Sequence, residues 1–180
     1  MSTKLKAPIE EYLSLPEGYP AELIGGRITV SPSPTYRHQS ICGDFFWKLK
    51  SFVENEKSGE VLYEFDVHFD DDNVLRPDIL FIKSERKDII KDNWVEGVPD
   101  MVIEVISPSS AAKDTVVKRE VYERFGVKEY WIVDPENEDV FVYENREGRF
   151  ILTCAGKECS SKVLKGFKWG FSKVRSSEQP

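Results

Sequence analysis

The chain has 180 residues, of which 40% are hydrophobic, so it is long enough for one well-packed domain and short for two. Its longest apolar runs, such as "YWIV" and "DILFI", have the length of strands, and none approaches the roughly 20 residues of a membrane-spanning helix, which excludes a helical membrane protein. The formal net charge of −7 counts against general nucleic-acid binding, because affinity for phosphate comes largely from Lys and Arg.

The first part of the chain alternates between helical and extended patterns. Residues 9–15 are predicted to form a short helix, and residues 21–34 a β-hairpin that turns at a Gly-Gly pair. Apolar residues recur at helical spacing over 38–56, which predicts the first long amphipathic helix. Strict alternation over 60–69 then predicts one strand with one face in water.

The second part of the chain predicts three strands, a helix and a hairpin. "RPDILFI" (76–82) follows a polar turn, and "DMVIEVI" (100–106), which is apolar on both faces except at one position, predicts a central strand. A helix over 114–125, capped by a glycine, precedes the strand "EYWIVDP" (129–135). Residues 139–153 predict a hairpin.

The order of these elements indicates the fold class. Helix, strand, strand, strand, helix, strand, with a hairpin added at each end, predicts an α/β or α+β fold around a mixed central sheet. No repeat or linker divides the chain, so we predict a single domain over residues 1–174 and a disordered tail over 175–180.

The termini and cysteines indicate the compartment. The N-terminal segment lacks the continuous apolar core and the cleavage site of a secretory signal, which predicts a cytoplasmic protein. Cys42, Cys154 and Cys159 are odd in number and lack the paired spacing of a zinc site or a disulfide framework. We therefore expect all three cysteines to be reduced.

The acidic charge is concentrated in one stretch. Residues 54–72 contain eight acids and one Lys, and 1 − 8 equals the −7 of the whole chain. Residues 157–175 instead contain six Lys or Arg and one Glu. The total charge is therefore a weaker objection to a nucleic-acid ligand than it first suggests.

Two acids, Asp78 and Glu104, interrupt apolar strand patterns. A buried carboxylate without partners costs several kcal/mol, so such residues usually lie beside a cation or hydrogen-bond donors. If the two strands are neighbours, about 4.8 Å apart, the carboxylates could together bind Mg²⁺ through oxygen. Asp100 shares a strand face with Glu104 but lies roughly 13 Å away, too far to share an ion, and is expected to end the preceding loop. From the residues alone, a structural role for each acid remains open, because Asp after Pro is common in turns and a buried Arg can satisfy one Glu.

The segments "RPDILFI", "VPDMVIEVISPSS" and "KDTVVKREVYERFGVKEYWIVDP" resemble the Uma-type restriction endonuclease family of the PD-(D/E)XK nuclease superfamily. The resemblance covers most of the chain, from "AELIGGRITVSPSP" to Pro135. It implies a restriction-endonuclease-like α-β-β-β-α-β core, dependence on Mg²⁺ with Mn²⁺ as a substitute, and hydrolysis of phosphodiester bonds in DNA. It assigns the two catalytic acids to Asp78 and Glu104, and we expect the main-chain carbonyl of Val105 to complete the metal site.

One position departs from the superfamily motif. The motif places Lys two residues after the second acid, where this chain has Ile106. Asp114, Lys118 and Tyr122 follow at spacings of four on one face of the predicted helix, and the resemblance implies that Lys118 supplies the displaced catalytic lysine. The residues alone favour a surface pair of Asp114 with Lys118, worth a few tenths of a kcal/mol.

Glu22 and His38 also match the family pattern and are secondary site candidates. Glu22 could lie beside the metal or pair with Arg27 across the hairpin. His38 begins a helix, where it could meet a phosphate or serve in capping and packing. Trp47 and Trp131 fall on apolar periodic positions and are predicted to be core residues rather than base-stacking residues.

Three functions are compatible with these residues. The first is a Mg²⁺-dependent DNA endonuclease. The second is a catalytically degenerate nuclease-fold module that binds DNA or a protein partner, with Ile106 marking the lost site. The third is a metal-dependent hydrolase with another substrate, since fold does not fix substrate. Cutting both DNA strands usually needs two active sites, so a homodimer is expected by analogy.

Overall fold

The architecture is seen in a computed structural model, which describes residues 8–31, 33–107 and 113–171, with side chains in the last range from residue 116 onward. The helices are α1 (Pro8–Leu13), α2 (Tyr36–Glu56), the 3₁₀ helix η1 (Ser84–Ile89), the π-helix η2 (Lys113–Lys118) and α3 (Arg119–Phe125). The strands are β1 (Ala21–Ile24), β2 (Arg27–Val30), β3 (Gly59–Tyr63), β4 (Val67–Asp70), β5 (Asn73–Leu75), β6 (Ile79–Lys83), β7 (Val95–Glu96), β8 (Met101–Val105), β9 (Glu129–Asp134), β10 (Asp139–Arg146), β11 (Arg149–Gly156), β12 (Glu158–Ser160) and β13 (Lys168–Gly170). The tail predicted over 175–180 lies outside the described residues. None of the described helices combines the length and apolar composition needed to cross a lipid bilayer.

A mixed six-stranded sheet forms the centre of the molecule. Its strand order is β11-β10-β9-β8-β6-β3, in which β8 pairs with β9 in parallel and the other neighbours are antiparallel. The prediction that the strand carrying Glu104 is central is confirmed. Together α2, β3, β6, β8, α3 and β9 form the predicted α-β-β-β-α-β core, with hairpins added at both ends.

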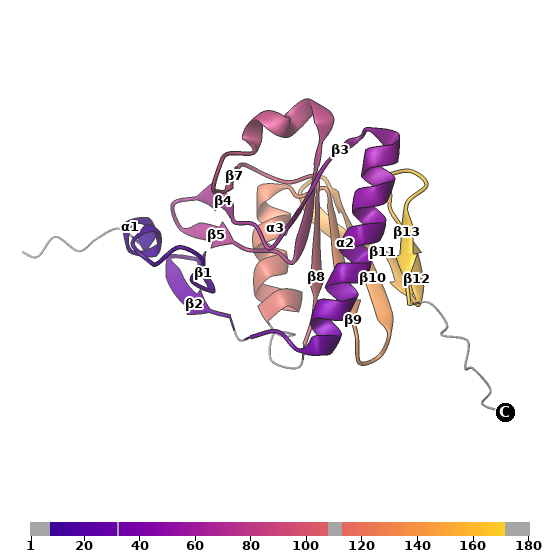
Figure 1. The fold of residues 1–180 in the computed structure, drawn as a ribbon, viewed down its shortest axis with the longest axis horizontal. Coiled ribbons are helices and arrows are strands. Elements are labelled where there is room, and N and C mark those ends of the chain that lie inside the picture. The colour runs from indigo at the N-terminus through magenta and orange to yellow at the C-terminus, as the bar shows by residue number, and fades with distance from the viewer. Residues whose placement is uncertain (1–7, 32, 108–112, 172–180) are drawn as a thin grey trace, which may run out of the picture.

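Helices α2 and α3 cover opposite faces of this sheet (Figure 1). On β6, Ile79 and Phe81 belong to the apolar cluster under α2, whereas Leu80 and Ile82 belong to the cluster that contains α3. This alternation follows from the period of two in a strand that is buried on both faces. On the far side of α3, Phe69 of β4 packs against the helix, so that α3 lies between the two sheets.

The second sheet has the order β2-β1-β5-β4-β7 and arises from a break that the sequence pattern did not predict. Residues 60–69 were expected to form one strand, but the chain turns at Glu64, whose φ of 44° lies in the left-handed region, so β3 and β4 enter different sheets. The partner hairpin arm breaks at Pro77, and β6 begins only at Ile79. The prediction of one continuous strand over 60–69 is therefore wrong. The alternation of apolar and polar residues continues through the bend, so the sequence pattern does not reveal where the first strand ends.

Two aromatic predictions have different outcomes. Trp131 is fully buried and packs edge-on against Phe45 of α2, as predicted. Trp47 is 67% exposed, so its assignment to the core is wrong. It lies on the outer face of α2, whose core face is formed by the set Cys42, Phe45, Leu49 and Val53.

The cysteines differ from the prediction. Cys154 of β11 and Cys159 of β12 form a disulfide, so the expectation that all three cysteines are reduced is wrong. The chain reverses between the two strands and brings the two Cα atoms to 5.9 Å, within the range that a disulfide requires. A separation of five residues matches no recognisable disulfide motif, so this bond could not be predicted from the cysteine spacing. Cys42 is free and buried.

Candidate active site

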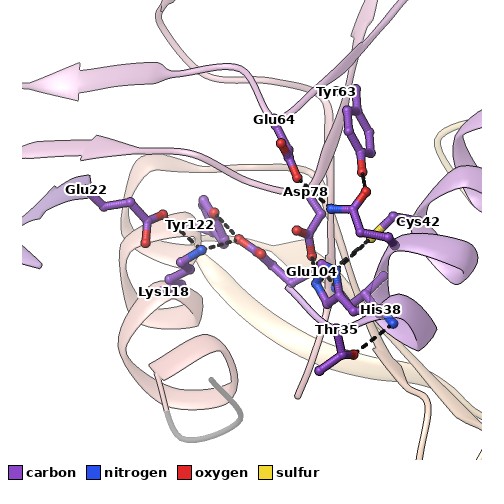
Figure 2. Close-up of polar contacts among 12 residues, drawn as sticks. Glu22, Thr35, His38, Cys42, Tyr63, Glu64, Asp78, Glu104, Lys118 and Tyr122 are labelled. Atoms are coloured by element: carbon purple, nitrogen blue, oxygen red, sulfur yellow. Dashed lines mark hydrogen bonds and ion pairs between the residues drawn. The ribbon is translucent and has the colours of Figure 1, made fainter. Parts of the chain in front are cut away.

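A cavity of about 340 Å³ opens where β8 ends and β6 begins, between the β1–β2 hairpin and the start of α2. Six residues that the sequence analysis singled out line it, namely Glu22, His38, Asp78, Glu104, Val105 and Lys118. They come from β1, α2, the segment before β6, β8 and η2, so only the folded chain brings them together. Figure 2 shows the side chains of Glu22, Lys118 and Glu104 on one side of this region and those of Asp78 and His38 on the other.

Asp78 lies directly before β6, and Glu104 lies on the neighbouring strand β8, which meets the condition that the sequence analysis set for a shared site. The β6–β8 register pairs Ile79 with Ile103, and one further step along this antiparallel ladder places Asp78 opposite Glu104. Asp78 Oδ2 accepts a hydrogen bond of 2.7 Å from the Val105 main-chain N–H, which fixes its carboxylate at the end of the sheet. From the break between β5 and β6, Asp78 lines the cavity.

Glu104 is 2% exposed and is held by two donors from the helix that follows its strand. Its Oε1 accepts hydrogen bonds from Lys118 Nζ at 3.0 Å and from the Tyr122 hydroxyl at 2.7 Å. Burial, together with the charge of Glu104, raises the pKa of Tyr122 well above its usual value, so the phenol stays protonated and donates. These contacts answer why a central strand tolerates a carboxylate.

Lys118 lies between two carboxylates (Figure 2). Its Nζ is 2.9 Å from Glu22 Oε1 and 3.0 Å from Glu104 Oε1, and the residue is 5% exposed. Lys118 is buried, so the prediction that it lies on the surface, paired with Asp114, is wrong for Lys118. The side chain of Asp114 lies outside the described residues. The formal charges of Glu22, Asp78 and Glu104 sum to −3, and the +1 of Lys118 leaves −2 on this group.

Ile106 occupies the position of the lysine in the superfamily motif, and the fold shows why this is compatible with a lysine at the site. Ile106 packs against the apolar cluster that contains α3. Lys118 ends the π-helix η2, whose wider turn is a common device at functional sites, and reaches Glu104 from there. The ammonium group therefore enters from the helix instead of from the strand.

Glu22 points into the cavity rather than toward the other arm of its hairpin. The hairpin register places Glu22 opposite Thr29 and Arg27 opposite Ile24, and among the described residues Glu22 pairs with Lys118 and not with Arg27. Glu22 Oε1 also accepts a hydrogen bond of 2.9 Å from the main-chain N–H of Arg76. The guanidinium of Arg76 is paired with Asp66 at 2.6 Å.

His38 faces Asp78 from the first turn of α2. The helix cap is Thr35, whose hydroxyl accepts the His38 N–H at 3.2 Å, so His38 itself is not the capping residue. Its Nε2 lies 3.3 Å from Asp78 Oδ2. Burial lowers the pKa of His38, but the hydrogen bond to Asp78, the charge of Asp78 and a hydrogen bond to the Val105 main chain outweigh burial and raise the pKa above its usual value.

Cys42, which the sequence analysis did not consider as a site residue, lies behind His38. Its Sγ is 3.6 Å from His38 Nδ1, so Cys42, His38 and Asp78 form a compact group of the residue types found in a nucleophile, its base and an orienting acid. The thiol is fully buried and does not line the cavity, which argues against attack on a substrate, and burial raises its pKa above the usual value. The signal that could have found Cys42 is its spacing of four from His38 on one helix.

Asp100 lies at the other end of β8 and takes no part in the cavity. It is fully buried and accepts hydrogen bonds from Lys83 N–H at 3.0 Å and Lys128 Nζ at 2.6 Å, with Arg86 at 3.1 Å. Burial raises the pKa of Asp100, but these donors outweigh it and lower the pKa. Its expected place just before the strand is confirmed. Asp100 has a structural role, because it binds donors from three separate segments of the chain.

Comparison with known proteins supports this picture. The family model Uma2, described as "Putative restriction endonuclease", matches residues 9–171. The chain belongs to the Uma2 family. The family match includes each of the residues that line the cavity and the segments on which the resemblance was first based.

A solved relative of this Uma2 protein has the same fold. It is a crystal structure titled as a putative nuclease belonging to DUF820 from Anabaena variabilis, with a TM-score of 0.68 and 25% sequence identity, covering 80% of this chain and 82% of the other. No curated protein matches this chain. The family and this relative support a nuclease, with a restriction-endonuclease-like fold.

Proposed function

We propose that this Uma2 protein is a metal-dependent endonuclease that hydrolyses phosphodiester bonds in DNA. The observation that carries the proposal is the buried group of Glu22, Glu104 and Lys118 beside Asp78, in one cavity open to solvent. Polar groups of this kind are costly to bury in a core, and their placement in a cavity is typical of a catalytic site.

The residues fit a hard divalent cation. Carboxylate and carbonyl oxygens are the ligands that Mg²⁺ prefers, and a group charge of −2 would be balanced by one such ion. Asp78, Glu104 and the main-chain carbonyl of Val105 would hold Mg²⁺, with Mn²⁺ as a substitute. When bound, the ion supplies Lewis-acid stabilisation of charge on the phosphate and activation of water.

Lys118 and Tyr122 act on the same carboxylate from the helix side. The Tyr122 hydroxyl, 2.7 Å from Glu104 Oε1, fixes the orientation of Glu104. The Lys118 ammonium lines the cavity and can donate to an attacking water or to a phosphate oxygen whose charge grows in the transition state. The packing of Glu104, Lys118 and Tyr122 in one hydrogen-bonded group holds these donors in place before substrate binds.

A catalytically degenerate module that binds DNA or a protein partner is the second candidate. Ile106 favours it, because the usual lysine is missing from the strand. The burial of Lys118 against Glu104 argues for retention of a lysine at the site, and we therefore place the nuclease first.

The expected partner is DNA, and a homodimer would supply one active site for each strand. The cytoplasm stays the expected location, because a nuclease that acts on cellular DNA must be in the same compartment as that DNA. The Cys154–Cys159 disulfide does not favour the cytoplasm, because reducing compartments rarely maintain such bonds.

Plasmid nicking in Mg²⁺ or Mn²⁺ tests the proposal. We expect Asp78→Asn, Glu104→Gln and Lys118→Met to lose on the order of 10²-fold or more in rate while circular dichroism shows an intact fold. Lys48→Met, which alters an exposed pair with Asp44 on α2, is the matched control and should nick at the wild-type rate. Wild-type nicking by Glu104→Gln would refute the assignment, and DNA binding without any nicking would favour the degenerate module.

A further inference from the structure

Three metal-binding side chains gather on the α2 side of the cavity, apart from Glu104. His38, Cys42 and Asp78 each offer one ligand atom, and these atoms all lie within 4.8 Å of one another. His38 Nε2 is 3.3 Å from Asp78 Oδ2, and Cys42 Sγ is 3.6 Å and 4.0 Å from the two imidazole nitrogens (Figure 2). One nitrogen, one sulfur and one oxygen ligand atom thus lie close together.

Two rigid elements hold this group. His38 and Cys42 are separated by four residues on α2, which places them one above the other on the face that packs on the sheet. Asp78 is fixed by the Val105 N–H at the end of β8. Because helix and sheet are joined through the apolar cluster that includes Cys42 and Phe45, the three ligand atoms are positioned by packing and do not depend on a surface loop.

The donor set differs from the one proposed for Mg²⁺. Thiolate and imidazole are ligands of zinc-type transition metals, whereas Mg²⁺ takes oxygen. A tetrahedral ion with bonds of about 2.0–2.3 Å needs ligand atoms roughly 3.3–3.8 Å apart. Through Nε2, His38 lies 3.3 Å from Asp78 Oδ2 and 4.0 Å from Cys42 Sγ, and the ligand atoms of the whole group lie within 4.8 Å of one another.

We propose that His38, Cys42 and Asp78 form a second cation site, which takes a zinc-type divalent transition metal and shares Asp78 with the oxygen-ligand site. The thiol loses its proton to solvent as the sulfur–metal bond forms. Three protein ligands leave a fourth position open, as in catalytic zinc sites. His38 and Asp78 line the cavity, so this position is accessible to water or to a phosphate oxygen. The site stands on ligand geometry and does not require that the chain be a nuclease.

Cys42 is placed to supply the sulfur ligand, and a bound ion would stabilise its thiolate. Cys42 is also the only thiol among the described residues that is not in a disulfide.

Cobalt titration tests the site directly, because Co²⁺ occupies zinc sites and a cobalt–thiolate bond gives a charge-transfer absorption in the near ultraviolet. The full chain carrying Cys154→Ala and Cys159→Ala serves as the background, so that Cys42 is the sole thiol. We expect the absorption to saturate at about one Co²⁺ per chain and to be displaced by Zn²⁺. The Cys42→Ser variant, which keeps size and shape, should lack it.

Two further variants separate this site from the proposed nuclease site. Glu104→Gln should abolish nicking in Mg²⁺ yet keep the cobalt–thiolate absorption, whereas His38→Gln should weaken Co²⁺ binding by about 10-fold or more. Absence of the absorption in the background chain at saturating Co²⁺, or its persistence after Cys42→Ser, would overturn the inference. If Cys42→Ser fails to fold, unchanged Co²⁺ affinity in His38→Gln is the contradicting result.

Discussion

The Lys118 ammonium lies 3.0 Å from the Glu104 carboxylate, although one residue ends a π-helix and the other sits in the central strand. With Glu22 at 2.9 Å on the other side, one positive charge separates two buried negative charges. This arrangement explains how the chain keeps an acid in the middle of an apolar strand, and it makes Lys118 both a structural and a candidate catalytic residue.

Removing the Lys118 charge should therefore destabilise the fold. Lys118→Met leaves Glu22 and Glu104 facing each other without a cation, and we expect the free energy of unfolding to fall by about 3–5 kcal/mol. Urea unfolding at neutral pH measures it, with Lys48→Met, an exposed pair on α2, expected to change by less than about 1 kcal/mol. Equal stability of the Lys118→Met variant and the wild type would show that the two carboxylates do not depend on this ammonium.

The sequence predicted the core elements and the two strand acids, because alternation and helical spacing are local properties of the chain. A shared metal site depended on the assumption that the strands of Asp78 and Glu104 are neighbours, and the β6–β8 pairing brings the two residues together. The five-stranded sheet could not be predicted, because the bend at Glu64 depends on a backbone conformation and on its N–H bonding to the Asp78 carbonyl at 3.0 Å. Such a contact exists only after the strands have met.

The lysine and the cysteines illustrate the same limit at the site. From the residues alone, Lys118 was predicted to lie on the surface. Helical spacing shows that it shares a helix face with Asp114 and Tyr122, but it does not show which element covers that face. Cys42 was expected only to be a reduced cysteine, and its contact with His38 is visible only once α2 is built. The disulfide partners Cys154 and Cys159 are joined by a chain reversal that no motif records.

The Tyr122 hydroxyl should contribute a charged hydrogen bond without being essential to packing. Tyr122→Phe keeps the buried ring and its contact with Phe69 but removes the 2.7 Å bond to Glu104. We expect a loss of about 1.5–3 kcal/mol in the free energy of unfolding and slower nicking through a misplaced Glu104. Tyr143→Phe is the control, because among the described residues its hydroxyl has no hydrogen-bond partner, and its half-buried ring packs against Tyr130 and Phe150. A fully active Tyr122→Phe variant would remove Tyr122 from the catalytic scheme.

Low pH should remove the contribution that Asp100, at the start of β8, makes to the free energy of unfolding. Its pKa is lowered in the folded protein, so the unfolded chain takes up the proton first as pH falls; the contribution is complete above the unfolded value near 3.8 and is lost as pH drops below it through the folded pKa. The free energy of unfolding, measured between pH 6 and pH 2, should therefore depend less on pH for Asp100→Asn than for the wild type. The Lys128→Met variant, which removes the donor at 2.6 Å, should lose part of this stability at neutral pH. Parallel pH profiles for all three proteins would contradict this account.

The outer face of α2 provides a test of the expected homodimer. Tyr36 and Trp47 are 90% and 67% exposed and lie eleven residues apart, about three helical turns, so they share one face. Gly43 lies between them, and a Cβ built there meets nothing within 4 Å, although glycine inside a helix costs about 0.5–1 kcal/mol. Antiparallel pairing of two α2 helices about a twofold axis would place Tyr36 opposite the second copy's Trp47 and let the helices approach closely at Gly43.

We therefore expect light scattering after size exclusion to show a dimer for the wild type and a monomer for Trp47→Glu. Leu152→Glu, which changes a 47% exposed residue on the edge strand β11, is the matched control and should remain dimeric. Because a charge at Trp47 alters no core contact, the Trp47→Glu variant should keep the wild-type melting profile extrapolated to low concentration. Dissociation by Leu152→Glu alone would move the interface to the sheet edge, and a wild-type monomer at micromolar concentration would require each protomer to cut DNA by itself.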